Sequence, residues 1–136
     1  MNLSFELHDL VRTLDRWADR ALRPEGLNYN RYVALVIIGE HPGITGRQLA
    51  GALGVSEPAG SCIVRKLIDA GLVSNGAETG AGNVRHLHLT GAGTAKTETC
   101  GALLGDALDR SAEDIDIDPD ELARTIHALH DAVRDG

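Results

Sequence analysis

The chain has 136 residues and a formal net charge of −7, with 43% hydrophobic residues but only 3% aromatic ones. This length suits one domain, residues 1–136, with a core of Leu, Ala, Val and Ile. No apolar run reaches the roughly 20 residues that span a bilayer, and the N-terminus mixes charged and apolar residues unlike a signal peptide. Two cysteines do not suggest a disulfide framework, so we expect a cytoplasmic protein.

The negative charge is concentrated at the C-terminal end. Residues 91–136 carry a net charge of −7, residues 1–43 carry −1, and residues 44–90 carry +1. Salt screens charges that lie more than about 8–10 Å apart. The acidic end therefore does not prevent the central segment from binding an anionic partner, although +1 predicts modest electrostatic affinity for DNA.

The first third of the chain has the pattern of two helices. Apolar residues at spacings of three and four predict one amphipathic helix over residues 3–22. Asn28 is suited to cap a second, nearly all-apolar helix over residues 29–40, which the following Pro42 ends. We expect Ile44 to form a short pairing with a later strand.

Two short helices joined by a turn come next. Thr45 and Gln48 form a capping box that opens a helix over residues 45–53. Ser56 is suited to cap a helix over residues 57–70. On this second helix, the side chains predicted to face inward are Ile63, Val64, Leu67 and Ala70, and those predicted to face outward are Ala59, Gly60, Ser61 and Arg65.

A β-hairpin and two long helices complete the chain. Residues 72–75 and 84–89 have the pattern of two strands, joined by the glycine-rich segment GAETGAGN. A long helix is predicted over residues 91–112, and Asp118-Pro119 opens the last helix. This order predicts a mainly α fold with a small hairpin wing, a winged helix-turn-helix. Residues 29–90 form its DNA-binding lobe, and the apolar stripes of residues 1–22 and 91–136 predict dimerisation helices.

The same order resembles the MarR (multiple-antibiotic-resistance regulator) family. The matching segments are LNYNRYVALVIIGEHPGITGRQLAGALGVS, IVRKLIDAGLV and LHLTGAGTAK. The resemblance implies a homodimeric transcriptional regulator, more often a repressor, that reads a palindromic DNA operator. It also implies a response to a small aromatic or phenolic effector.

The resemblance assigns the DNA contacts by position. Helix 57–70 becomes the recognition helix, and Arg85 lies beside the wing. The family's wing carries an Asp and an Arg two residues apart, where this chain has Ala81 and Asn83. Without that Arg the wing lacks a minor-groove contact, which favours weak or narrowly specific binding. The complete set of expected DNA contacts is Arg47, Gln48, Ser56, Ala59, Gly60, Ser61, Arg65, Lys66 and Arg85.

The family's effector pocket corresponds to an aromatic group on the first two helices. An aromatic wall and a cation would suit a phenolic carboxylate, and ordinary packing between helices, with Trp17 at the dimer seam, is the favoured alternative. The residues concerned are Arg16, Trp17, Tyr29, Tyr32 and His41.

The remaining reactive side chains suggest ordinary roles. Cys62 is expected to fill a small apolar space, with a thiol sensor as the alternative. The pairs His86/His88 and His127/His130 are expected to be solvated, because a zinc site needs three or four ligands. We expect no metal, no cofactor and no enzymatic activity, since G-x-S-x-G and H-E-x-x-H are absent. The alternatives are a protein-interaction module with weakened DNA binding and a redox- or metal-sensing regulator on the same scaffold.

Overall fold

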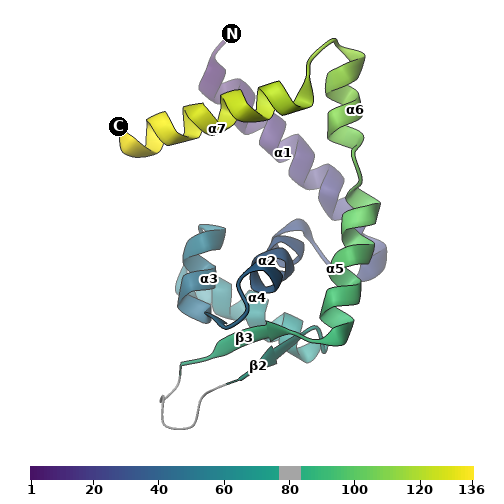
Figure 1. Cartoon of the computed structure of the whole chain (residues 1–136), viewed down its shortest axis with the longest axis vertical. Coiled ribbons are helices and arrows are strands. Elements are labelled where there is room, and N and C mark those ends of the chain that lie inside the picture. Colours follow the sequence, from purple (N-terminus) through teal and green to yellow (C-terminus); the bar gives the residue numbers. More distant parts are fainter. Residues whose placement is uncertain (77–83) are drawn as a thin grey trace. The chain divides into compact units, whose positions relative to one another are not determined.

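The computed structural model describes residues 1–76 and 84–136 and divides into two compact units, residues 1–104 and 105–136. It is mostly helical with one small sheet, which confirms the predicted fold class (Figure 1). Within the described residues, we find no helix long and apolar enough to cross a membrane. In chain order the elements are α1 (Leu3–Leu22), η1 (Arg23–Glu25), α2 (Tyr29–Glu40), β1 (Ile44–Thr45), α3 (Gly46–Leu53), α4 (Glu57–Asp69), β2 (Val73–Asn75), β3 (His86–Leu89), α5 (Gly91–Leu104), α6 (Ala107–Asp114) and α7 (Pro119–Asp135).

Local capping sets the helix starts, as predicted. The Asn28 side chain accepts a hydrogen bond from a first-turn amide of α2 at 2.9 Å. Thr45 accepts from the Gln48 amide at 3.1 Å, while the Gln48 side-chain oxygen accepts from the Thr45 amide at 3.0 Å. Ser56 accepts from the Ala59 amide at 3.2 Å. These bonds satisfy donors that have no partner within the helix, so the predicted caps of all three helices are confirmed.

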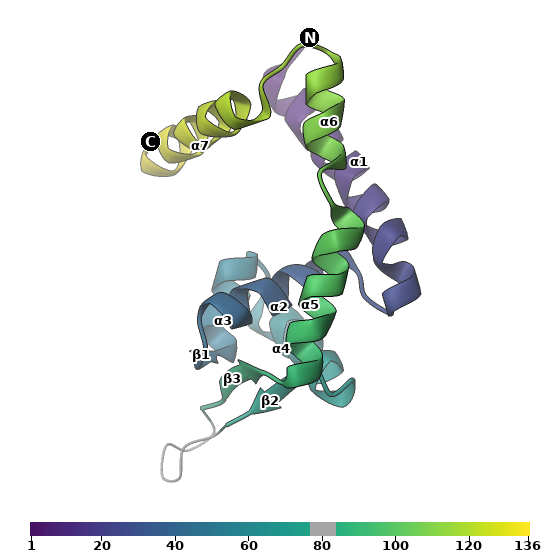
Figure 2. The ribbon, with the colours of Figure 1, turned by 45° about the vertical axis from the view of Figure 1, so that its right-hand side comes forward.

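The three strands form an antiparallel sheet in the order β1-β3-β2 (Figure 2). Ile44 is paired with Leu87, which confirms the expected short pairing, and Val73 is paired with Leu89. The sheet, the end of α1 and helices α2, α3, α4 and α5 enclose one apolar core. Its fully buried large side chains are Leu22, Leu35, Ile38, Leu49, Leu67, Leu87 and Cys100.

Helix α5 packs against α1 and α2 (Figure 2). Cys100 of α5 is fully buried in the core. The Lys96 ammonium lies 2.7 Å from a carboxylate oxygen of Glu25, and both side chains are mostly buried. This ion pair joins α5 to the turn that follows α1.

The predicted helix over residues 91–112 is wrong, because the chain breaks between α5 and α6. Gly105 has φ +54°, a left-handed conformation that cannot continue a right-handed helix. The strand predicted over residues 84–89 is also too long. Val84 and Arg85 precede β3. Among the described residues, the outermost hydrogen bond of the hairpin runs from the Gly76 amide to the His86 carbonyl.

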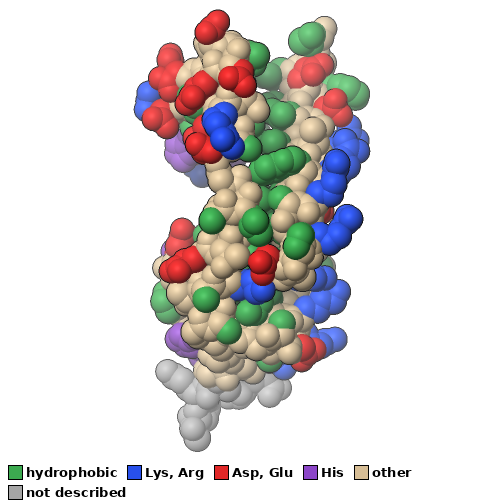
Figure 3. Space-filling model, turned by 90° about the vertical axis from the view of Figure 1, so that its right-hand side faces the viewer, with side chains coloured by type: hydrophobic (Ala, Val, Ile, Leu, Met, Phe, Trp, Pro, Cys, Tyr) green, Lys and Arg blue, Asp and Glu red, His purple; other side chains and the backbone are tan. Residues whose placement is uncertain are grey.

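The second unit, residues 105–136, consists of α6 and α7. It contains ten acidic and three basic side chains, and Figure 3 shows acidic groups gathered there. Asp118 caps α7 as predicted, accepting from the Asp120 amide at 3.0 Å. Four apolar side chains of α7 at helical spacing are exposed: Leu122, Ile126, Leu129 and Val133. Such a stripe indicates a missing partner surface.

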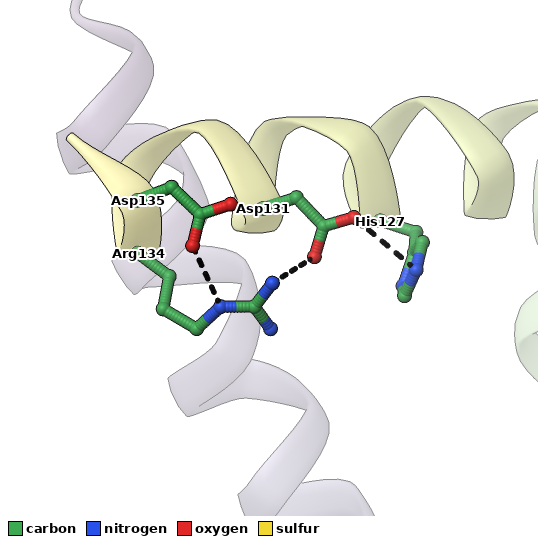
Figure 4. A network of polar contacts seen from close by, with 4 residues as sticks. All are labelled: His127, Asp131, Arg134 and Asp135. Carbon is green, nitrogen blue, oxygen red and sulfur yellow. Dashed lines mark hydrogen bonds and ion pairs between the residues drawn. The ribbon is translucent and has the colours of Figure 1, made fainter.

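A surface network of charged groups lies on α7 (Figure 4). Asp131 Oδ1 lies 2.9 Å from Arg134 Nη2 and Asp131 Oδ2 lies 3.5 Å from His127 Nε2, while Arg134 Nε donates to Asp135 at 3.2 Å. His127, Arg134 and Asp135 are largely exposed, and Asp131 is partly exposed. Exposed ion pairs of this kind contribute little to stability.

Candidate nucleic-acid interface

Helices α3 and α4 cross at very close range, and Gly60 makes this possible. A Cβ atom at position 60 would lie 2.8 Å from the Cβ of Ala50 and 3.3 Å from its Cα. Gly60 is buried with Val64 and Leu67, which lie four and seven residues further along α4. The prediction that Gly60 faces outward is therefore wrong, because residues at this spacing share the inner face of the helix.

The outer face of α4 consists of small side chains followed by cations. Ala59, Ser61 and Cys62 are exposed, as are Arg65 and Lys66 in the second half of the helix. The prediction that Cys62 fills an apolar space is wrong, since position 62 lies about 200° around the helix from position 60. Ala70, predicted to face inward, is also exposed, because it caps the end of α4 instead of belonging to its inner stripe.

One ion pair bridges the starts of α3 and α4. Arg47 Nε lies 3.3 Å from Glu57 Oε1, and the two side chains are 86% and 67% exposed. Glu57 was missed by the sequence reasoning, although an acidic residue in the first turn of a helix is a recognisable signal. Gln48, which we expected near a DNA backbone, is exposed, but its side-chain oxygen is engaged by the Thr45 amide.

A hollow of about 690 Å³ lies between α3, α4 and the sheet. Arg47, Glu57, Ser61 and Arg85 line it together. The structure thus brings three predicted DNA contacts, Arg47, Ser61 and Arg85, to one concave surface together with Glu57. Arg85 is exposed and precedes β3, so it does not lie within a strand as expected. Ala81 and Asn83 of the wing lie outside the described residues.

Three further cations are exposed on α4 and beside β3: Arg65, Lys66 and Arg85, of which Arg85 lines the hollow. Within residues 1–76 and 84–136, none of the three forms an ion pair. They remain available to phosphate groups, whose contacts with Lys and Arg provide most of the sequence-independent affinity for DNA.

The predicted effector residues are only partly brought together. Tyr29 and Tyr32 have ring centroids 6.3 Å apart, and the Tyr29 amide donates to Asp19 of α1 at 2.8 Å. Burial raises the pKa of the Tyr32 hydroxyl, and the nearby Cys100 and Tyr29 raise it further. Tyr32 is thus a neutral hydrogen-bonding group at physiological pH.

His41 does not belong to this aromatic group. It follows the last turn of α2, twelve residues after Tyr29, or about 18 Å along the helix axis. It lines a separate hollow of about 620 Å³ with Pro42 and Gln48. Arg16 is exposed and Trp17 is 39% exposed on α1. The aromatic group therefore comprises residues near the start of α2, without His41.

The hairpin histidines have different surroundings. His86 is half-buried and its Nδ1 lies 3.0 Å from the Gly43 carbonyl oxygen, whereas His88 is exposed. The expectation of two solvated histidines is thus wrong for His86. In the part of the chain that the structure describes, no three His, Cys, Asp or Glu side chains are grouped to hold a metal ion.

Comparison with known proteins agrees with this architecture. The MarR family model matches residues 25–80. The HTH-type transcriptional repressor Rv2887 of Mycobacterium tuberculosis is 29% identical over 102 residues, covering 75% of this chain and 73% of the relative. The chain is thus similar to MarR-family proteins across its winged helix-turn-helix.

Solved structures of MarR proteins share its fold over nearly the whole chain. The crystal structure of M. tuberculosis Rv2887 with salicylic acid has a TM-score of 0.72 at 25% identity, covering 97% of this chain and 96% of that one. A MarR variant from E. coli complexed with operator DNA has a TM-score of 0.81 at 23% identity, covering 96% of this chain and 92% of that one. The winged helix-turn-helix and its flanking helices are therefore those of the MarR fold.

Proposed function

We propose that this protein is a MarR-type, homodimeric, ligand-responsive transcriptional repressor that acts in the cytoplasm and reads a palindromic operator with α4. The observation that carries the proposal is the concave surface where the exposed face of α4 meets Arg47 and Arg85. Helix-turn-helix proteins place this second helix in the major groove, with its N-terminal residues against base edges. The repressor Rv2887 and the operator complex of E. coli MarR support the same reading.

The contacts divide by chemistry. Arg65, Lys66 and Arg85 form no ion pair with other described residues, and we assign them to phosphates, where they fix the position of the protein. Ser61 and Ala59 are short and exposed near the start of α4, and we assign them to base edges. A serine hydroxyl can donate or accept, and an alanine methyl suits the thymine methyl group. The Ser56 hydroxyl oxygen already accepts a hydrogen bond as the cap of α4. Any contact of Ser56 with DNA would therefore have to share this hydroxyl with the cap.

A second copy of the chain supplies the other recognition helix. Exposed apolar side chains lie on α1, including Phe5 at 64% and Val11 at 53%, and on α7. Apolar surfaces of this kind mark association sites. A two-fold dimer places its two recognition helices one DNA turn apart, about 34 Å, so that both enter the major groove.

An aromatic acid is the proposed effector. The structure of Rv2887 contains salicylic acid, and the aromatic pair Tyr29 and Tyr32 lies where α1 meets α2. An effector that prefers a dimer with altered helix spacing would weaken operator binding by its differential affinity for the two states, typically about 1–3 kcal/mol.

The test is binding to the DNA upstream of the protein's own gene, measured by fluorescence anisotropy across a salt series. Wild type is compared with Arg65→Ala and with Arg124→Ala, an exposed arginine of α7 outside the proposed surface. Arg65→Ala should weaken binding to all sequences and reduce the salt slope by about 1, while Arg124→Ala should bind as wild type does. Absence of selective binding even near about 50 mM salt, where phosphate contacts are strongest, would instead favour a protein-interaction module.

A further inference from the structure

We infer that Glu57 reads a cytosine in each half-site and that the Arg47–Glu57 ion pair orients its carboxylate for this purpose. The inference rests on the proposed function, because it requires α4 to enter the major groove. It adds a specificity-determining residue to a recognition helix whose other exposed side chains in the first turn are apolar.

The first turn of α4 offers one long polar side chain to a base. Pro58 and Ala59 carry no polar side-chain atoms, Gly60 is buried against Ala50, and Ser56 is engaged as the cap. Glu57 is 67% exposed and lines the hollow between α3, α4 and the sheet. At the start of α4, the side chain best placed to contact a base is therefore the Glu57 carboxylate.

A carboxylate distinguishes bases because it can only accept hydrogen bonds. Guanine and thymine present acceptors in the major groove and would repel it. Adenine presents the N6 amino donor beside the N7 acceptor, whereas cytosine presents the N4 amino group without an adjacent acceptor. A carboxylate at this position should therefore prefer cytosine, with adenine second.

The positive charge of Arg47 offsets the repulsion between the Glu57 carboxylate and nearby phosphates. Its Nε lies 3.3 Å from Glu57 Oε1, which leaves Oε2 as an acceptor and the terminal guanidinium N–H groups as donors for a phosphate. The pair spans α3 and α4, whose separation is fixed by the contact between Gly60 and Ala50. The carboxylate is thus held by a side chain from a second helix.

Two properties should follow. Removal of the Glu57 charge should change which base is preferred at one position, and it should also raise affinity for all DNA by removing a repulsion. Loss of any acidic side chain on α4 should raise affinity for all DNA in this way, so the experiment needs a control variant that removes the same charge elsewhere on the helix. Asp69 is exposed at the last residue of α4, about 18 Å from Glu57 along the axis.

The experiment selects binding sites from a pool of randomised duplex DNA with wild type, Glu57→Gln and Asp69→Asn. Wild type should enrich cytosine at one position of each half-site. Glu57→Gln should enrich adenine at that same position, because a glutamine amide pairs with adenine N6 and N7. Asp69→Asn should retain cytosine. In anisotropy titrations, a cytosine-to-adenine change should weaken wild-type binding about tenfold and strengthen binding of Glu57→Gln.

The outcomes separate the two proposals. Selective binding with the same preferred base for wild type and Glu57→Gln overturns this inference and leaves the proposed function intact. A shift in preferred base with Asp69→Asn also overturns it, because the effect would then come from charge alone. A wild-type protein that enriches no sequence overturns both the inference and the proposed function.

Discussion

The close contact between α3 and α4 predicts that Gly60→Ala destabilises this protein, against the usual preference of helices for alanine. In a helix, replacing glycine by alanine normally stabilises by about 0.5–1 kcal/mol. At position 60, however, the added methyl group would lie 2.8 Å from the Cβ of Ala50. The two helices must then move apart or the backbone must shift.

The magnitude follows from the opposing effects. Overpacking a well-packed site costs typically about 1–3 kcal/mol, and the conformational gain offsets about 0.5–1 kcal/mol of this. We expect a net loss of about 1 kcal/mol in the free energy of unfolding. Gly51→Ala is the matched control in the neighbouring helix, because a Cβ atom there meets nothing within 4 Å. It should stabilise by about 0.5–1 kcal/mol.

Urea denaturation at equal protomer concentration measures both variants, with an unchanged m-value as the sign that only stability has changed. A double variant tests the cause. Ala50→Gly removes the opposing methyl group, so its combination with Gly60→Ala should cost less than the two single losses added together. A Gly60→Ala protein at least as stable as wild type would refute the close crossing of α3 and α4.

Two further predictions concern cysteine reactivity and the start of α5. In the native protein the exposed Cys62 should react with a thiol reagent, and bound DNA should protect it. Cys100 should react only on unfolding, because it is buried and burial is the main cause that raises the pKa of its thiol. Equal labelling rates under native conditions, measured by mass spectrometry, would contradict this. Gly93→Ala should destabilise by more than about 3 kcal/mol, since its Cβ would overlap the Leu72 carbonyl oxygen. Gly91→Ala, with open space around it, should melt close to wild type.

Local signals in the sequence were sufficient for most helix starts. The bond between Thr45 and Gln48 spans three residues, and its geometry depends on little beyond them, so the capping box was predictable. The same holds for Asn28 and Ser56. Helix α1 has the predicted bounds, because an uninterrupted apolar period is followed at once by a Pro-containing turn.

Glycine shows where local reasoning fails. Gly101 continues α5, with the Tyr32 hydroxyl 3.4 Å from where its Cβ would be, whereas Gly105 ends the helical run four residues later. Glycine permits both conformations at similar cost, so the choice depends on what each turn packs against. The sequence pattern alone therefore could not locate the break between α5 and α6.

The candidate site was predictable in its elements but not in its contacts. Gly60 was assigned to the outer face although its spacing to Val64 and Leu67 places it inside, an error that helical periodicity could have corrected. The ion pair of Arg47 and Glu57 is different. It joins residues on two helices whose crossing depends on a glycine-alanine contact. Such a pair is a tertiary feature and cannot be read from the spacing of charges.

The charge distribution also bears on how such a protein would find its operator. Residues 1–104 contain ten basic and ten acidic side chains, and residues 105–136 contain three and ten. A molecule with this balance gains little long-range attraction to DNA. On the α4 surface, moreover, one of the four basic side chains at positions 47, 65, 66 and 85 is paired with an acid. Affinity must then come mainly from short-range complementarity. A weakly charged surface in which an acid faces the bases disfavours non-specific binding more than it disfavours the correct site, so it favours selectivity at the expense of overall affinity.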